Sequence, residues 1–229
     1  MIKESTAETI RTLRSGTKYP GLIRFLIGRI FYTDAINTVI GFMALYTMNV
    51  AAATGLTPAQ ATTQKSLVMA VAITFAVPAG LVWGRVTDRV GPKCTLTWVL
   101  YLWMATFGLA ASIGFLKLQV FWLFVVACMA GIAMAGTWSA DRPYMLRLTP
   151  PDRVGEFYGL YGMVGRFSAI TGPALWAMTT YWLVERSGAD VLTGEGVAIL
   201  VLLLMIVVSY FILRPVTDER RDWDRLRAL

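Results

Sequence analysis

Long apolar runs separated by short polar links constrain this sequence more than any other feature. Six runs of seventeen to twenty-nine residues follow a polar opening stretch. An α-helix rises about 1.5 Å per residue, so runs of this length match a hydrocarbon layer about 30 Å thick. We therefore predict an all-α integral membrane protein with six transmembrane helices, at about residues 22–48, 66–83, 94–115, 119–138, 155–183 and 197–213.

The composition agrees with a membrane location. Hydrophobic residues make up 56% of the chain and charged residues 15%, with a mean hydropathy of +0.59, whereas soluble domains carry about 25% charged residues. The net charge is +7. We expect the basic residues to interact with anionic lipid rather than nucleic acid, because they lie on one side of the predicted spans. The chain has no histidine and no H-E-x-x-H, G-x-S-x-G or phosphate-binding glycine motif, so no enzyme activity, cofactor or metal is expected.

The distribution of Lys and Arg predicts the topology. Of the 21 basic residues, all but Lys65, Lys117 and Arg186 fall on one side of the predicted spans. Basic residues stay in the cytoplasm, so we predict a multi-pass protein of the cell inner membrane with both termini cytoplasmic. The chain then divides into a cytoplasmic segment at 1–20, a six-helix membrane domain at 21–213 and a charged cytoplasmic tail at 214–229.

Two inner links are predicted to form a cytoplasmic gate. The first is a ten-residue turn, G-R-V-T-D-R-V-G-P-K, in which two glycines and a proline favour chain reversal. Its expected functional residues are Gly84, Arg85, Asp88, Arg89, Gly91 and Lys93. In the second inner link, Arg142 and Glu156 are either part of a latch or simply solvated charges.

Charges inside the first and fifth runs indicate where function resides. Asp34, the one carboxylate deep in any predicted span, lies about 18 Å along the first run, and Arg166 lies about 16 Å along the fifth. A charge at the bilayer centre costs at least about 2.5–3.5 kcal/mol unless it is paired or hydrated. We expect Asp34 and Arg166 to pair or to share a polar cavity with Arg29 and Asn37, for substrate or proton coupling. Alternatively, Asp34 is permanently ionised and only holds helices together.

Small residues in the fifth run predict close helix packing and a bend. Glycines at three- and four-residue spacing let backbones approach, and a Gly-Pro step favours a kink. These stripes serve either static packing or a sliding surface. The residues concerned are Gly159, Gly162, Gly165, Gly172 and Pro173.

The pattern G-R-x-x-D-R-x-G-x-K between two membrane helices resembles the cytoplasmic loop signature of the major facilitator superfamily. Two other segments resemble the branch containing autophagy-related vacuolar effluxers and their bacterial relatives. They are F-Y-x-D-x-x-N-T-V-I at 31–40, and P-P-x-R-x-x-E-F-Y-G-L-Y, G-R and G-P within 150–173. All three match the C-terminal six-helix half, so the resemblance implies half of a facilitator fold, a 3+3 inverted repeat.

The resemblance implies secondary active transport of a small solute by a half-sized facilitator; amino acids and other small metabolites are the substrates suggested by the branch. Such a transporter encloses its substrate between two halves. The expected partners are therefore membrane lipid, a small solute and either a second copy, forming a homodimer, or a separately encoded N-terminal half. The alternative is a non-transporting accessory or scaffold subunit of a membrane protein complex.

Overall fold

The computed structural model of this chain describes residues 21–167 and 169–217, and the elements in them are helical. The predicted segment at 1–20 and most of the predicted tail at 214–229 lie outside these residues. In chain order the elements are α2 (Leu22–Ala53), α3 (Pro58–Val90), α4 (Pro92–Leu116), α5 (Phe121–Leu148), η1 (Pro151–Arg153), α6 (Val154–Phe167), α7 (Thr171–Thr180), η2 (Tyr181–Arg186) and α8 (Val191–Leu213).

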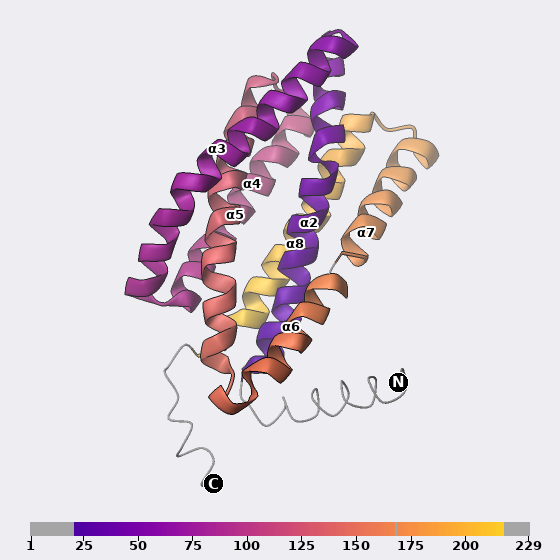
Figure 1. Cartoon of the computed structure of the whole chain (residues 1–229). Helices are drawn as coiled ribbons and strands as arrows, with labels where there is room; N and C mark the ends of the chain where they lie inside the picture. The colour runs from indigo at the N-terminus through magenta and orange to yellow at the C-terminus, as the bar shows by residue number, and fades with distance from the viewer. Residues whose placement is uncertain (1–20, 168, 218–229) are drawn as a thin grey trace, which may run out of the picture.

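Five helices, α2, α3, α4, α5 and α8, are long and apolar enough to cross a membrane by length and composition. The predicted fifth span is instead divided into α6, of 14 residues, and α7, of 10 residues. Each is shorter than a hydrocarbon layer of about 30 Å requires. In Figure 1, α7 follows α6 along the bundle with a break between them. The predicted bend is thus a full interruption of the helix, just before Gly172-Pro173.

The bundle has two ends, which we name after their glycine connections. The α3–α4 and α5–α6 connections lie at the Gly91 end, and the α2–α3, α4–α5 and η2–α8 connections lie at the Gly55 end (Figure 1). Lys117 and Arg186 belong to the Gly55 end, and the basic residues of the two predicted inner links belong to the Gly91 end. The segregation of basic residues assumed from the sequence therefore has a counterpart in the fold.

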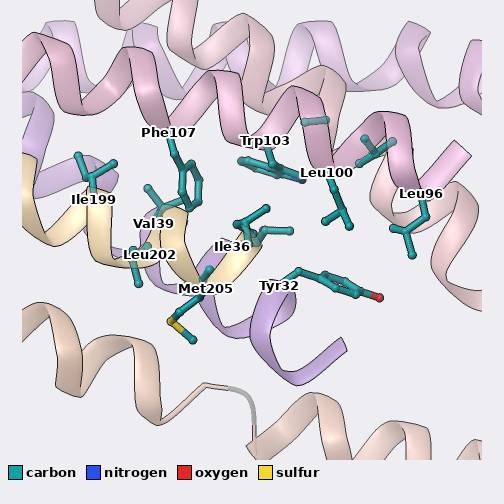
Figure 2. Packing of buried hydrophobic residues seen from close by; sticks show 14 of the residues in the cluster. Tyr32, Ile36, Val39, Leu96, Leu100, Trp103, Phe107, Ile199, Leu202 and Met205 are labelled. Atoms are coloured by element: carbon teal, nitrogen blue, oxygen red, sulfur yellow. The ribbon is translucent and has the colours of Figure 1, made fainter. Parts of the chain in front are cut away.

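The core lies where α2, α4 and α8 meet. Trp103 and Phe107 of α4 are fully buried, and Figure 2 shows them beside Ile36 and Val39 of α2, with Leu202 of α8 nearby. Because lipid is as apolar as these side chains, close packing rather than exclusion of water stabilises such contacts. α3 differs from its neighbours, since only four of its 33 residues are buried and it packs chiefly on α5.

The helix α3 corrects the predicted ten-residue turn. The chain remains helical from Gly84 through Val90, and the reversal occurs at Gly91, whose φ of 90° suits glycine. Pro92 then opens α4, where its missing N–H costs nothing because the first amides of a helix have no helical partner. A change from apolar to charged residues thus marked the end of the hydrocarbon layer and not the end of the helix.

Two other helices also extend beyond the apolar runs that predicted them. α5 continues ten residues beyond the predicted end at Trp138, so Asp141 and Arg142 lie in the helix rather than in a loop. α8 begins at Val191, six residues earlier than predicted, and Glu195 is buried within it instead of lying in an outer link. Both corrections place an acidic side chain inside the bundle.

Candidate functional site

Buried charges join α2, α5 and α6 in a cluster made of Arg29, Tyr32, Asp141 and Tyr161, which we call the Arg29–Asp141 cluster. Arg29 Nε donates to Asp141 Oδ2 at 3.0 Å, and Arg29 Nη1 donates to the Tyr161 carbonyl oxygen at 3.1 Å. The guanidinium carbon lies 3.7 Å from the centroid of the Tyr161 ring, within cation–π range. Arg29 therefore bonds to both α5 and α6.

Asp141 is held by three donors. The Tyr161 hydroxyl donates to Oδ2 at 2.6 Å, the Tyr32 hydroxyl donates to Oδ1, and Arg29 supplies the third bond. The exposed fractions of Arg29 and Asp141 are 8% and 5%. Because both oxygens of the carboxylate have donors and its charge is matched, this buried pair meets the conditions under which an ion pair is tolerated in an apolar interior.

A small polar cavity adjoins the Arg29–Asp141 cluster. Its volume is about 140 Å³. Exposed Asn37 and Arg142 line it together with the buried pair. The structure therefore brings three of the predicted site residues, Arg29, Asn37 and Arg142, to one cavity. The complete lining is Arg29, Thr33, Ile36, Asn37, Met134, Thr137, Trp138, Asp141, Arg142 and Tyr161.

Asp34 occupies a second, separate environment. Its side chain is fully buried, and Oδ2 accepts the backbone N–H of Gly172 at 2.8 Å, at the first turn of α7. Oδ1 has no hydrogen-bond partner among the residues that the structure describes. The start of a helix carries free amide groups and a partial positive charge, so it favours a carboxylate there.

The predicted pair of Asp34 and Arg166 is not present. Arg166 is exposed, and within 21–167 and 169–217 no ion pair joins it to Asp34. Equal depth does not imply a common face. On α2, Arg29 and Asp34 are five residues apart, which separates them by about 140° around the helix axis. Arg29 therefore reaches α5 and α6, while Asp34 reaches α7.

The glycines of the fifth run divide into two groups. A Cβ on Gly172 would lie 2.1 Å from Thr38 Oγ1 and 2.9 Å from Asp34 Oδ1, and a Cβ on Gly165 would lie 3.1 Å from Arg29 Nη1. These two glycines allow α6 and α7 to approach the charged residues of α2. For Gly159 and Gly162, a Cβ would meet no described atom within 4 Å. Within the described chain no helix packs closely on Gly159 or Gly162, so their packing role stays a prediction.

The predicted gate residues lie at the Gly91 end. Arg85, Asp88 and Arg89 are exposed on the last turns of α3. Lys93 Nζ donates to the Arg214 carbonyl oxygen at 3.1 Å, which links α4 to the end of α8. In the second link, Glu156 lies 3.9 Å from Arg153 in an exposed ion pair, which is a weak interaction.

Sequence reasoning missed Asp141, Tyr32 and Tyr161. Asp141 was assigned to a loop because the apolar run ends near Trp138. The available signal was Arg29, since a buried arginine requires an anionic partner. Both tyrosines lie in the segments that resemble the family branch, but their residue type did not indicate a polar role, because aromatic residues are common in membrane spans as packing or anchor residues.

The similarity of this chain to known proteins agrees with this architecture. A model of the Major Facilitator Superfamily matches residues 26–227. The chain is 22% identical over 210 residues to the uncharacterized MFS-type transporter YxiO of Bacillus subtilis strain 168, with 91% of this chain and 44% of that protein covered. It is 29% identical over 212 residues to autophagy-related protein 22-1 of Neosartorya fischeri, with 88% and 32% covered.

An uncharacterized protein of Aquifex aeolicus strain VF5 is 24% identical over 153 residues, with 67% of this chain and 37% of that protein covered. The chain thus spans less than half the length of each of these relatives. No solved structure matches it significantly. The relatives include the branch whose motifs the sequence resembles, so that prediction is confirmed. By the match over most of its length, this chain belongs to the Major Facilitator Superfamily, a family of membrane transporters rather than enzymes.

Proposed function

We propose that this chain is a membrane unit of a secondary active transporter for a small solute, and that Asp34 carries the coupling proton. The observation that supports this proposal is the buried Oδ1 of Asp34, which has no hydrogen-bond partner among the described residues. It lies beside the start of α7, where the helix is interrupted. Secondary transporters commonly use interrupted helices near the middle of the membrane to bind ions and substrates.

The proposed cycle uses the two charged environments differently. Ionised Asp34 holds the start of α7 through the Gly172 amide, and a proton on Asp34 removes the charge that favours this contact. Release lets α7 move relative to α6, which stays joined to α2 through Arg29 and Tyr161. Alternating access then follows from movement at the interruption between α6 and α7.

The solute is proposed to bind in the polar cavity next to the Arg29–Asp141 cluster, where Asn37 and Arg142 are exposed. Arg166, also exposed, is a further candidate. An exposed arginine in a membrane span requires water or a protein partner. A cavity of about 140 Å³ is small for a metabolite by itself, so the complete site would include a facing surface.

We propose that a second six-helix unit supplies that surface. An apolar groove of about 730 Å³ between α2, α3, α4 and α5 continues the polar cavity through Trp138 and Met134. Around Gly159 and Gly162 of α6, no described atom would contact an added Cβ within 4 Å, which leaves space for a neighbouring helix. A second copy of this chain is the simplest partner, because two-fold dimers are the commonest homo-oligomers; a separately encoded half is the alternative.

We place the assembly in the inner membrane with both termini cytoplasmic, because basic residues gather at the Gly91 end.

The test compares Asp34→Asn with Asp190→Asn in proteoliposomes that carry an inward proton gradient and receive a panel of radiolabelled amino acids. Asp190 is an exposed acid paired with Lys117 at 3.5 Å, so its variant controls for loss of a carboxylate. We expect Asp34→Asn to abolish gradient-driven uptake and Asp190→Asn to retain it. Full gradient-driven uptake by folded Asp34→Asn protein contradicts the coupling role.

A second measurement separates a transporter from an accessory or scaffold subunit. Cysteines are placed at positions 34 and 37 after Cys94 and Cys128 are replaced by serine, and a membrane-impermeant thiol reagent is added from either side. A transporter gives labelling that changes when substrate is applied, and the single cysteine variant at position 37, which keeps Asp34, also responds to a proton gradient. Complete protection of both positions under all conditions favours the scaffold, and native mass spectrometry gives the number of copies per particle.

A further inference from the structure

A third buried acid, Glu195, lies at the Gly55 end, far along the bundle from the Arg29–Asp141 cluster. It is on α8, four residues after Val191, and therefore about 6 Å inside the helix start. The exposed fraction of its side chain is 2%. An acid in this position is costly in an apolar surrounding unless its oxygens are bonded or its charge is neutralised.

Within the described chain, one oxygen of Glu195 is bonded and the other is not. Asn49 of α2 donates from Nδ2 to Oε1 at 2.8 Å, while Oε2 is buried and has no hydrogen-bond partner in the described part of the chain. The hydroxyl of neighbouring Tyr46 donates a hydrogen bond to the Ala110 carbonyl oxygen at 2.6 Å and not to Glu195. Glu195 thus keeps one buried acceptor open.

Glycines on both sides hold Glu195 in place. A Cβ on Gly194 would lie 2.7 Å from Val184 Cγ2, and a Cβ on Gly196 would lie 3.3 Å from the Ala111 carbonyl oxygen. α8 therefore contacts η2 on one side of Glu195 and α4 on the other. With the backbone this close to both neighbours, the side chain remains inside the bundle.

A cavity of about 350 Å³ adjoins Glu195. It extends to exposed residues of η2, including Tyr181 and Glu185, so a small ion has a route from the surface. A bound cation would supply the partner that Oε2 lacks. The cavity is lined by Leu45, Asn49, Trp176, Ala177, Thr180, Tyr181, Val184, Glu185, Val191 and Glu195.

The charges around the cavity favour a cation. Among the described lining residues Glu185 is the second acid and there is no Lys or Arg. At the C-terminal end of α4, Lys117 is paired with Asp190 at 3.5 Å. In η2, Arg186 lies over the Trp182 ring at 5.8 Å. From α2 and α7, the polar groups that face Glu195 or its cavity are neutral: Tyr46, Asn49 and Thr180.

We propose that Glu195 and Asn49 form a binding site for a small monovalent cation, either a proton or Na⁺, at the Gly55 end. A proton would bind at Oε2, whereas Na⁺ would take Oε2, the Asn49 amide oxygen and water as ligands. Binding requires only this pocket and does not depend on the proposed transport function. If that function holds and the bound cation is a proton, we propose that this site takes part in the same coupling as Asp34.

The experiment measures the modification of Glu195 by dicyclohexylcarbodiimide, a membrane-soluble reagent that adds to protonated carboxyl groups. The full-length protein is reconstituted in liposomes and exposed to the reagent over a range of pH, with Na⁺ or choline as the cation at constant ionic strength. Peptide mass spectrometry then locates the adduct. Glu195→Gln controls for the assignment, and Glu185→Gln is the matched control for an exposed acid lining the same cavity.

A proton site predicts an adduct on Glu195 that declines as pH rises and does not change with Na⁺. A Na⁺ site predicts the same adduct with suppression by Na⁺ and not by choline. In both cases Glu195→Gln loses the adduct and Glu185→Gln keeps it. An adduct independent of pH and Na⁺, or no adduct on Glu195 in folded protein, overturns the proposal. Because no solute is measured, a failed uptake assay leaves this outcome unaffected.

Discussion

Asp141 and Asp34 are both buried acids that contact α2 or lie on it, yet their surroundings differ. Asp141 receives donors from Arg29, Tyr32 and Tyr161 and its charge is matched by the guanidinium. Asp34 accepts the backbone N–H of Gly172 and also interacts with Thr171 at the start of α7, and its Oδ1 has no hydrogen-bond partner within the described chain. The Arg29–Asp141 cluster therefore resembles a structural anchor, whereas the unbonded oxygen of Asp34 fits the coupling role that we propose for it.

The difference follows from which element each acid meets. Asp141 faces side chains of α2 and α6, and the donor groups of these side chains bond to both of its oxygens. Asp34 faces the start of a short helix, whose free amide groups approach closely only because residue 172 is glycine. One environment rests on side-chain chemistry and the other on backbone proximity, and substitutions should affect the two in different ways.

The largest effect is expected from Asp141→Asn. It leaves Arg29 buried without its counter-ion, and breaking such a pair costs about 3–5 kcal/mol. The free energy of unfolding should fall by that amount in a titration with sodium dodecyl sulfate, followed by tryptophan fluorescence. If the variant does not fold, the double variant Arg29→Met with Asp141→Leu keeps the test open. It should recover much of the loss, because both charges are gone, and a double variant as unstable as Asp141→Asn contradicts this view of the cluster.

A smaller effect is expected from Gly172→Ala. The new methyl group would lie 2.1 Å from Thr38 Oγ1, so α7 must move away from α2, and overpacking of this kind costs about 1–3 kcal/mol. Gly159→Ala is the matched control, because its methyl group would meet no described atom within 4 Å. The same unfolding titration should show a loss for Gly172→Ala alone. Equal losses would mean that Gly172 is not needed for the approach of α7, and Thr38→Ala should partly rescue the variant.

The sequence predicts the membrane spans well because length and apolarity decide whether a helix crosses a bilayer. α2, α3, α4 and α8 each contain a predicted run, α5 contains all but the first two residues of one, and the fifth predicted run is divided between α6 and α7. The ends of the helices are predicted less well. Hydropathy marks where the hydrocarbon layer ends, while a helix such as α5 continues beyond it and carries Asp141 into the bundle.

Side-chain partners within the candidate site are harder to predict than spans. The sequence gives the depth of Asp34 and Arg166 along their helices, but the face of each helix depends on how the helices rotate and pack. The interruption between α6 and α7 adds to this difficulty, because it changes the register between Arg166 and the residues that follow. The sequence identifies Arg29, Asp34 and Asn37 as unusual within a span, and the structure separates them into two environments.

The smallest change in stability is expected from Asp34→Asn. The asparagine has the shape of the acid, and its amide oxygen still accepts the Gly172 N–H, so the net change should resemble that of one ordinary hydrogen bond, about 0.5–1.5 kcal/mol. Unfolding is measured under the conditions used for Asp141→Asn, and the pH dependence of solute uptake is recorded on the same preparation. A near-normal unfolding transition with uptake that no longer responds to pH distinguishes Asp34 from the anchor at Asp141. If instead Asp34→Asn unfolds as readily as Asp141→Asn, Asp34 mainly holds α7 in place, and the coupling proton must bind elsewhere.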